Sequence, residues 1–378
     1  MNVKDLKHSL GRHIINIPGW RTNRKIVVIE SDDWGCIRMP SRKVKQKLHQ
    51  AGMQLQNDPY SLYDTLAEKD DLNALYEVLT SVKDKNGRNA VLTADTNVAN
   101  PDFEKIAASG YQEYFHEPFT DTLKRTQGSV DTYQVWKQGI DAGVFYPQFH
   151  GREHVNVRKW LHDLRVNHAN VRLWFELGSY GTSYLVDNAQ SGHYMTAFDS
   201  ADPNDITFYK KSIIEGLNLF EQLFGYRSKT FIATTYCWPL EIESTLKENG
   251  VNFLQGMISQ KIPLDNGINY RTKKSNFQGT KSKSGLTYLM RNAFFEPSQN
   301  PGFDWVNYCL QRVEIAFRCY KPATISMHRL NVIGGLVEEN RTRNLAKLKQ
   351  LLNEIVKRWP DVEFMNSSEL GALILGKR

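Results

Sequence analysis

Short runs of apolar, often β-branched residues alternate along most of this chain with longer stretches whose apolar residues recur at helical spacing. The run from Ile26 to Ile29 predicts a strand that is buried on both faces. Further strands are predicted at residues 90–94, 144–149, 230–233, 251–254, 286–290, 323–327 and 362–365. Helices are predicted at residues 42–50, 71–82, 155–164, 210–224, 240–249, 305–319 and 344–356, and from Ser367 onward. This alternation favours a parallel-stranded α/β barrel or open sheet.

Three stretches depart from the alternation. Residues 1–24 form a basic lead-in that ends in a turn. Residues 100–135 are rich in aromatic side chains and predict an irregular excursion over one face of the protein. Residues 260–284 are basic and contain glycine, which is typical of a mobile loop. We therefore expect a lead-in at 1–24 and one domain at 25–378, with an insertion around residues 40–135.

Composition narrows the class of protein. The 378 residues are 40% hydrophobic and 24% charged, as in ordinary globular proteins. The net charge of +7 is spread along the chain instead of forming a basic stripe, so neither nucleic acid nor a membrane is an expected partner. The sequence shows neither a signal peptide nor an apolar run of about eighteen residues. Four cysteines without a CxxC pair suggest free thiols, and we expect a cytoplasmic protein whose oligomeric state is open.

Ionisable side chains follow three of the predicted strands. Asp32 and Asp33 end the first, His150 follows the strand at 144–149, and His328 follows the strand at 323–327. The carboxyl ends of parallel strands meet at one edge of a sheet or barrel, where ligands bind. His154 follows His150 by four residues, so a helix there would point both imidazoles the same way. Two imidazoles and one carboxylate form a hydrolytic metal site with a position left open for water.

Three segments resemble motifs of one known family. The segments Ser31 to Gly35, His150 to His154 and Ile325 to His328 are similar, in this order, to the first, second and fifth motifs of the polysaccharide deacetylases. That family has a distorted (β/α) barrel and removes N- or O-acetyl groups from sugars. The resemblance implies the same fold, with inserted helical and loop segments, and an acetylated sugar or polysaccharide as substrate.

The resemblance also implies a role for each residue of these motifs. Asp33, His150 and His154 would bind a divalent metal, and the ligand types favour zinc. Asp32 would be the general base that accepts a proton from the metal's water, whose pKa the metal lowers while it polarises the acetyl carbonyl. His328 would be the general acid that protonates the leaving group.

The two adjacent aspartates need different environments to play these roles. Successive side chains of a strand point to opposite sides, so Asp32 and Asp33 can both face the metal only if the strand ends between them. The residues Trp34 and Gly35 predict that it does. The family's third motif brings an arginine that orients the base, but the segment Lys229 to Pro239 has none. Arg38, Arg291 and Arg329 are candidates to replace it, and the sequence does not choose among them.

Aromatic and basic side chains near these motifs are candidates to bind the sugar, since aromatic rings stack on apolar faces. The predicted substrate-binding residues are Trp34, Arg152, Tyr236, Trp238 and Arg329. Two other functions stay open. A catalytically impaired protein on the same barrel would bind a sugar or a metal without turnover. A glycoside hydrolase would need two carboxylates at different strand ends and would leave the histidines unexplained.

Overall fold

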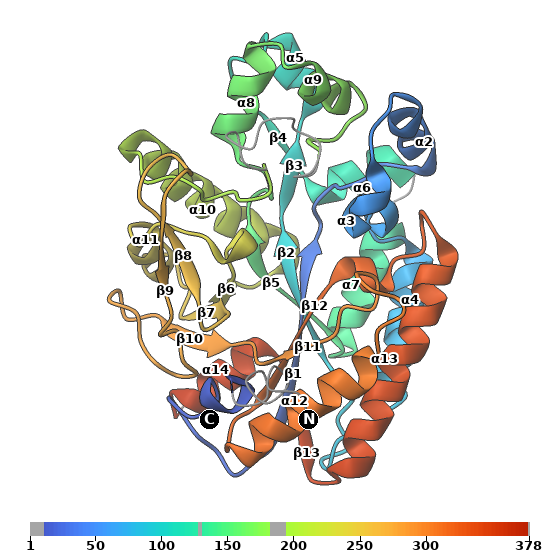
Figure 1. Ribbon diagram of the computed structural model, residues 1–378, viewed down its shortest axis with the longest axis vertical. Helices are drawn as coiled ribbons and strands as arrows, with labels where there is room; N and C mark the ends of the chain where they lie inside the picture. Colours follow the sequence, from blue (N-terminus) through green and yellow to red (C-terminus); the bar gives the residue numbers. More distant parts are fainter. Residues whose placement is uncertain (1–10, 128–130, 182–193, 377–378) are drawn as a thin grey trace.

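Parallel strands form one curved sheet at the centre of the protein (Figure 1). The computed structural model describes residues 11–127, 131–181 and 194–376, and within these ranges the sheet has nine strands. They are β1 (Lys25–Trp34), β2 (Leu92–Asn97), β5 (Phe145–Gly151), β6 (Thr230–Phe231), β7 (Phe253–Gly256), β10 (Thr287–Met290), β11 (Ala293–Phe294), β12 (Ala323–His328) and β13 (Val362–Met365). Their order is β10-β7-β6-β5-β2-β1-β12-β11, and β13 pairs with the first residues of β1.

The two edges of this sheet are joined by the chain itself. β10 lies at one edge and β11 at the other, yet only Arg291 and Asn292 separate them in sequence. Three Cα steps of about 3.8 Å each bridge this gap, so the sheet must curl until its edges meet. The N–H of Arg291 donates to Gly256 of β7 (2.8 Å), and the N–H of Asn292 donates to Thr324 of β12 (3.1 Å). The predicted distorted (β/α) barrel is confirmed, with Arg291 at its seam.

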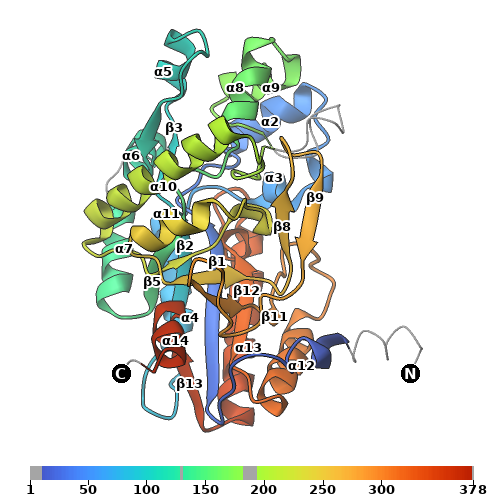
Figure 2. The same ribbon diagram turned by 90° about the vertical axis from the view of Figure 1, so that its left-hand side faces the viewer.

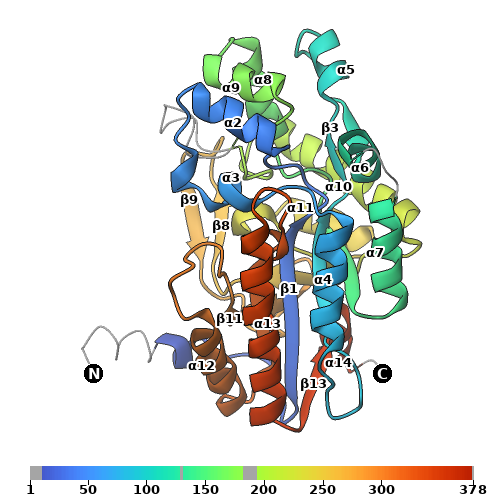
Figure 3. The same cartoon turned by 90° about the vertical axis from the view of Figure 1, so that its right-hand side faces the viewer.

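Side chains of β1 alternate between two apolar environments, which explains why its sequence is apolar without interruption. Val27 and Ile29 pack into the outer core, under helices α4 (Lys69–Thr80), α7 (Asp131–Asp141), α12 (Trp305–Arg318) and α13 (Glu338–Arg358). Figure 3 shows α4 and α13 on either side of β1. Ile26 and Val28 instead pack with Phe253 and residues of α14 (Ser367–Ile374). The helix α14 begins with a capping box between Asn366 and Glu369.

Another apolar core lies under α10 (Pro203–Phe224) and α11 (Ile242–Glu248), which cover the sheet next to β5, β6 and β7 (Figure 2). Above the carboxyl ends of the strands lie α2 (Arg42–Gln50), α3 (Pro59–Tyr63), α8 (Val157–Arg165) and α9 (Ala169–Glu176). No helix of the described residues is long and apolar enough to cross a membrane.

Most of the elements predicted from periodicity are present, with ends that differ by up to seven residues, the largest difference being the start of α10 at Pro203 instead of residue 210. Two stretches were predicted wrongly. The segment 100–135 is not irregular, because it contains α5 (Phe103–Ala108), β4 (His116–Pro118), α6 (Phe119–Gln127) and the start of α7. β4 pairs with β3 (Ala99–Pro101). In the segment 260–284, strands β8 (Gln260–Pro263) and β9 (Tyr270–Lys273) form an antiparallel hairpin. Strand pairing orders β3 with β4 and β8 with β9, and these strands are too short to show an apolar period in the sequence.

Candidate metal and catalytic site

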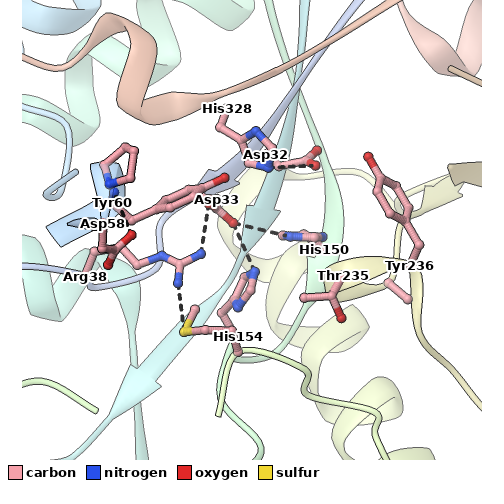
Figure 4. Close-up of a pocket in the computed structure, with 13 residues that line it drawn as sticks. Asp32, Asp33, Arg38, Asp58, Tyr60, His150, His154, Thr235, Tyr236 and His328 are labelled. Atoms are coloured by element: carbon pink, nitrogen blue, oxygen red, sulfur yellow. Dashed lines mark hydrogen bonds and ion pairs between the residues drawn. The ribbon is translucent and has the colours of Figure 1, made fainter. Parts of the chain in front are cut away.

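A pocket of about 290 Å³ opens at the carboxyl ends of β1, β5 and β12 (Figure 4). Its lining includes all five residues for which the sequence predicts chemistry: Asp32, Asp33, His150, His154 and His328. Segments that are far apart in sequence therefore meet here, as expected for one edge of a parallel barrel. Arg38, Tyr60 and Tyr236 also line the pocket.

An irregularity in β1, and not its end, brings both aspartates into the pocket. The strand continues to Trp34, contrary to the prediction that it stops between Asp32 and Asp33. Its pairing with β2 shifts register between Ser31 and Trp34, and Asp33 has a φ of +74°. This bulge cancels the usual alternation, so the two carboxylates share one cavity. Gly35 completes the turn with a φ of +77°, and a Cβ there would lie 2.2 Å from the carbonyl oxygen of Asn97.

Asp33, His150 and His154 form the one His, Cys, Asp and Glu group of the described residues that is arranged to hold a metal ion. Asp33 Oδ1 lies 3.0 Å from His154 Nε2 and 3.6 Å from His150 Nε2, and all three ligand atoms lie within 4.8 Å of one another. All three side chains are buried. One carboxylate and two imidazoles are a donor set that zinc accepts while a fourth position stays open.

The two histidines converge through a turn, whereas the sequence suggested a helix. β5 ends at Gly151, which has a φ of +115°, and α8 begins only at Val157. His150 Nδ1 lies 2.9 Å from the carbonyl oxygen of Ile232, so Nδ1 carries the proton and Nε2 faces Asp33 with a free lone pair. Burial and the charge of Arg38 lower the pKa of His154 to about 4 although Asp33 opposes this, so the imidazole is neutral at pH 7, the form that can bind a metal.

Arg38 contacts the other oxygen of Asp33. Its Nη2 donates to Asp33 Oδ2 at 2.9 Å, which leaves Oδ1 directed at the two histidines. Burial alone raises the pKa of Asp33, but the charge of Arg38 and the histidines hold that pKa well below its usual value. The carboxylate is therefore ionised and oriented for a metal. Arg38 is thus not the arginine that orients the base.

Arg291 binds Asp32 with both terminal nitrogens. Nη1 donates to Oδ2 at 2.7 Å and Nη2 to Oδ1 at 2.6 Å. The same guanidinium contacts Glu30 (2.6 Å) and Asp95 (2.9 Å), and its side chain is fully buried. Burial raises the pKa of Asp32, but the charge and hydrogen bonds of Arg291 outweigh this and lower it to about 2. Of the three arginines that the sequence offered, Arg291 is the one that contacts Asp32.

Glu296 is a site residue that sequence reasoning missed. Its Oε1 lies 2.6 Å from His328 Nδ1, and its Oε2 accepts a hydrogen bond from Asn331 at 2.7 Å. Burial lowers the pKa of His328, but Glu296 and then Asp32 raise it to about 9. The imidazole is thus protonated at neutral pH, with Nε2 3.8 Å from Asp32 Oδ2. Glu296 lies outside every motif and beyond the predicted strand, so no local signal in the sequence marks it.

Of the five predicted substrate-binding residues, only Tyr236 lines the pocket. Its hydroxyl accepts a hydrogen bond from Arg291 Nη1 at 3.2 Å. Both Tyr236 (φ +56°) and the preceding Thr235 (φ +55°) have left-handed backbone conformations. Such conformations are strained for these residue types and are concentrated at functional sites.

The other predicted sugar contacts, Trp34, Trp238, Arg152 and Arg329, are buried and do not line this pocket. Trp34 is buried in the outer core against Trp136 and Phe145. Trp238 is also buried, and its indole N–H donates to Glu243 at 3.2 Å. The bulge at Asp33 explains the position of Trp34, because it turns the aspartates into the pocket and the next side chain toward the helices.

The two arginines of this set form buried ion pairs. Arg329 is fully buried and contacts Asp64 at 2.9 Å. Arg152 contacts Glu153 at 2.6 Å and also pairs with Glu215 of α10. A guanidinium that leaves water needs such partners, and these contacts account for the burial of both side chains.

Comparisons with known proteins concern the fold alone. No family model matches the sequence, and no curated protein matches it. A crystal structure assigned to a polysaccharide deacetylase from Mycobacterium smegmatis is 12% identical, covers 95% of this chain and 93% of its own, and has a TM-score of 0.44. The 4-alpha-glucanotransferase of Thermococcus litoralis is 10% identical and has a TM-score of 0.45. The match covers 92% of this chain and 40% of the glucanotransferase. A CE4 family pseudoenzyme of Bacillus anthracis is 10% identical and has a TM-score of 0.37. The match covers 92% of this chain and 66% of the pseudoenzyme.

Proposed function

We propose that this protein is a metal-dependent hydrolase that removes an acetyl group from a nitrogen or oxygen of a carbohydrate. The observation that carries the proposal is that one pocket holds a candidate metal site and, beside it, two further ionisable side chains. Asp33, His150 and His154 present three metal ligands, while Asp32 and His328 line the same cavity outside that set. A three-ligand site beside a base and an acid is what hydrolysis of an acetyl amide or ester requires.

The three ligands are built to receive a divalent cation, for which zinc suits the donor types. When bound, the metal polarises the acetyl carbonyl and lowers the pKa of water. Asp33 offers Oδ1 because Arg38 occupies Oδ2, and His150 offers Nε2 because Nδ1 is bonded to a backbone carbonyl. These second contacts fix the ligand atoms before any ion arrives.

Asp32 has the features of a general base. Its low pKa keeps it ionised, and a carboxylate held by two arginine hydrogen bonds still has lone pairs left to accept a proton from water. Tyr236 contacts the same guanidinium, so the base and one wall of the pocket are positioned by Arg291 together.

His328 is expected to serve the chemistry and not the metal. It lies on β12 beside Asp32, outside the group of ligand atoms. Replacing it with alanine should lower acetate release by about a hundredfold or more, the usual scale for a lost general acid. Metal content, measured by elemental analysis of the same preparation, should stay at the level of the parent. If metal is lost with activity, His328 is a ligand.

The pH profile should report the contact between Glu296 and His328. An acid must be protonated, so activity is expected to fall as pH rises through the folded-state pKa of His328, about 9. In Glu296→Gln the negative charge is gone, and this alkaline limb should move down by about one to two pH units. The measurement is kcat/KM against pH for both proteins. Since glutamine can still hydrogen-bond the ring, an unmoved limb would contradict the role of Glu296.

A direct test of the proposed function needs only the purified protein. We expect about one divalent cation per chain, and acetate release from at least one member of a panel of N- and O-acetylated sugars. His150→Ala should lose both. Metal binding without acetate release from any substrate would favour the binding-protein alternative. No metal in the parent, even after reconstitution, would remove the proposal.

Two structural observations weigh against the alternatives. The impaired-protein hypothesis rested on the missing arginine of the third motif, and Arg291 makes the contact with the base that this arginine would make. A glycoside hydrolase needs a second free carboxylate across the pocket. Asp58 is the remaining lining carboxylate among the described residues, and it caps α3 by accepting from the N–H groups of Tyr60 and Ser61.

A further inference from the structure

A second cavity lies beside the β8–β9 hairpin, in the basic segment whose order the sequence did not predict. This groove has a volume of about 790 Å³ and is bounded by β9, the start of α11 and the turn at residues 280–284. The segment 236–243 separates it from the catalytic pocket: Tyr236 lines the pocket, whereas Glu243 lines the groove. Figure 2 shows the hairpin standing beside the sheet, next to α11.

Four cationic side chains line the groove: Arg271, Lys273, Lys281 and Lys283. Among the described residues, none of the four forms an ion pair. Lys273 donates a hydrogen bond to the hydroxyl of Tyr288 at 2.9 Å and lies over its ring. Arg271, Lys281 and Lys283 are exposed and Lys273 is half-buried, and four like charges around one concavity make its potential positive and attract an anion.

The groove also contains a buried donor that has nothing to bind. Ser282 is 8% exposed and lies between Lys281 and Lys283 on the turn. Its Oγ has no hydrogen-bond partner, although its backbone N–H is bonded to Leu286. Burying a hydroxyl without a partner costs free energy, and an oxyanion held by the neighbouring lysines would accept a hydrogen bond from it.

The acidic residues of the groove do not neutralise this charge. Glu243 accepts the indole N–H of Trp238 at 3.2 Å, and Glu241 is exposed at the rim. Two carboxylates face four cations, so the lining keeps a net positive charge. Burial lowers the pKa of Lys273, and the nearby charge of Lys283 lowers it further while Glu243 raises it.

We propose that this groove is a binding site for a multiply charged oxyanion of the phosphate class, held by Lys281, Lys283 and Arg271 and by the hydroxyl of Ser282. The site is separate from the metal ligands, and the inference does not depend on the proposed function. Lysine and arginine supply charge-assisted hydrogen bonds, and the serine supplies a fixed donor between them.

The test titrates the metal-loaded protein with inorganic phosphate in low-salt buffer and follows binding by calorimetry. Lys281→Gln/Lys283→Gln should weaken binding by about fivefold or more, the scale of two exposed charge contacts. Ser282→Ala should also weaken binding although it changes no charge. The matched control is Lys349→Gln/Lys357→Gln, two exposed lysines of α13 with the same total change, and it should bind like the parent.

The outcomes separate this site from the metal. Binding that is lost in His150→Ala but kept in the lysine variant would place phosphate on the metal and overturn the proposal. Equal binding by the parent and by the Lys281/Lys283 and Ser282 variants, or no saturable binding by the parent, would overturn it too. If the lysine variant raises KM only for a phosphorylated acetyl sugar and not for a neutral one, the anion belongs to the substrate. If phosphate binds while both sugars are hydrolysed alike, the anion is a separate ligand.

Discussion

Asp33→Asn is expected to lose metal binding and acetate release together. Asp33 supplies the one carboxylate oxygen of the ligand group, with Oδ1 facing both histidines. The neutral amide keeps the size of the side chain but removes the charge that attracts a dication. Loss of an outer contact alone lowers metal affinity ten- to a hundredfold, so this ligand should cost at least about a hundredfold. Zinc titration and acetate release on one preparation measure both effects.

The fold should survive this change sufficiently for the test. In Asp33→Asn the amide oxygen can still accept a hydrogen bond from Arg38. The Arg38 guanidinium also lies over the ring of Tyr60 and near Asp64, and these contacts are unchanged. A thermal melt of the metal-free parent and variant checks this point. Retained zinc at parental affinity would show that Asp33 is not a ligand and would move the metal site elsewhere.

Asp32→Asn should give the opposite pattern: metal retained and turnover lost. The ligand atoms are untouched, while the group that accepts the proton from water is neutralised. Deleting a general base costs about a hundredfold or more in kcat. Arg291 would keep its contacts with the carboxyl groups of Glu30 (2.6 Å) and Asp95 (2.9 Å), so it stays anchored at the same place. The adjacent variants are matched controls for each other, since each removes one carboxylate charge from the same bulge.

The comparison has two informative failures. Equal zinc loss in both variants would mean that the two aspartates share the metal. Unchanged turnover in Asp32→Asn would leave the proposed mechanism without its base and would favour a different group as the proton acceptor.

Each aspartate of the pair has its own arginine, which gives a physical reason for the different roles that we propose for them. Arg38 holds Asp33 by one oxygen and leaves the other for a cation. Arg291 holds Asp32 by both oxygens and keeps it away from the ligand group. Neighbouring carboxylates would otherwise repel each other and compete for the same ion.

The local pattern of the sequence determined the strands, most of the helices and the residues that carry chemistry. The period of apolar side chains is a property of each segment, so the run before Asp32 and the strand before His328 could be recognised without the rest of the chain. Parallel strands end at one edge, so the convergence of Asp33, His150 and His328 followed from their positions after strands. What the alternation of a strand could not predict was the bulge that turns Asp32 and Asp33 into one pocket.

Only the tertiary structure decided which partners these residues have. Arg291 and Asp32 are 259 positions apart, and they meet because the sheet closes at the two residues between β10 and β11. Glu296 reaches His328 across 32 positions without any motif. Trp34, Trp238, Arg152 and Arg329 looked like sugar-binding residues by type, yet packing and ion pairing bury all four. Contacts between distant segments depend on how strands curl and helices cover them, and that information is spread over the whole chain instead of lying beside the residues concerned.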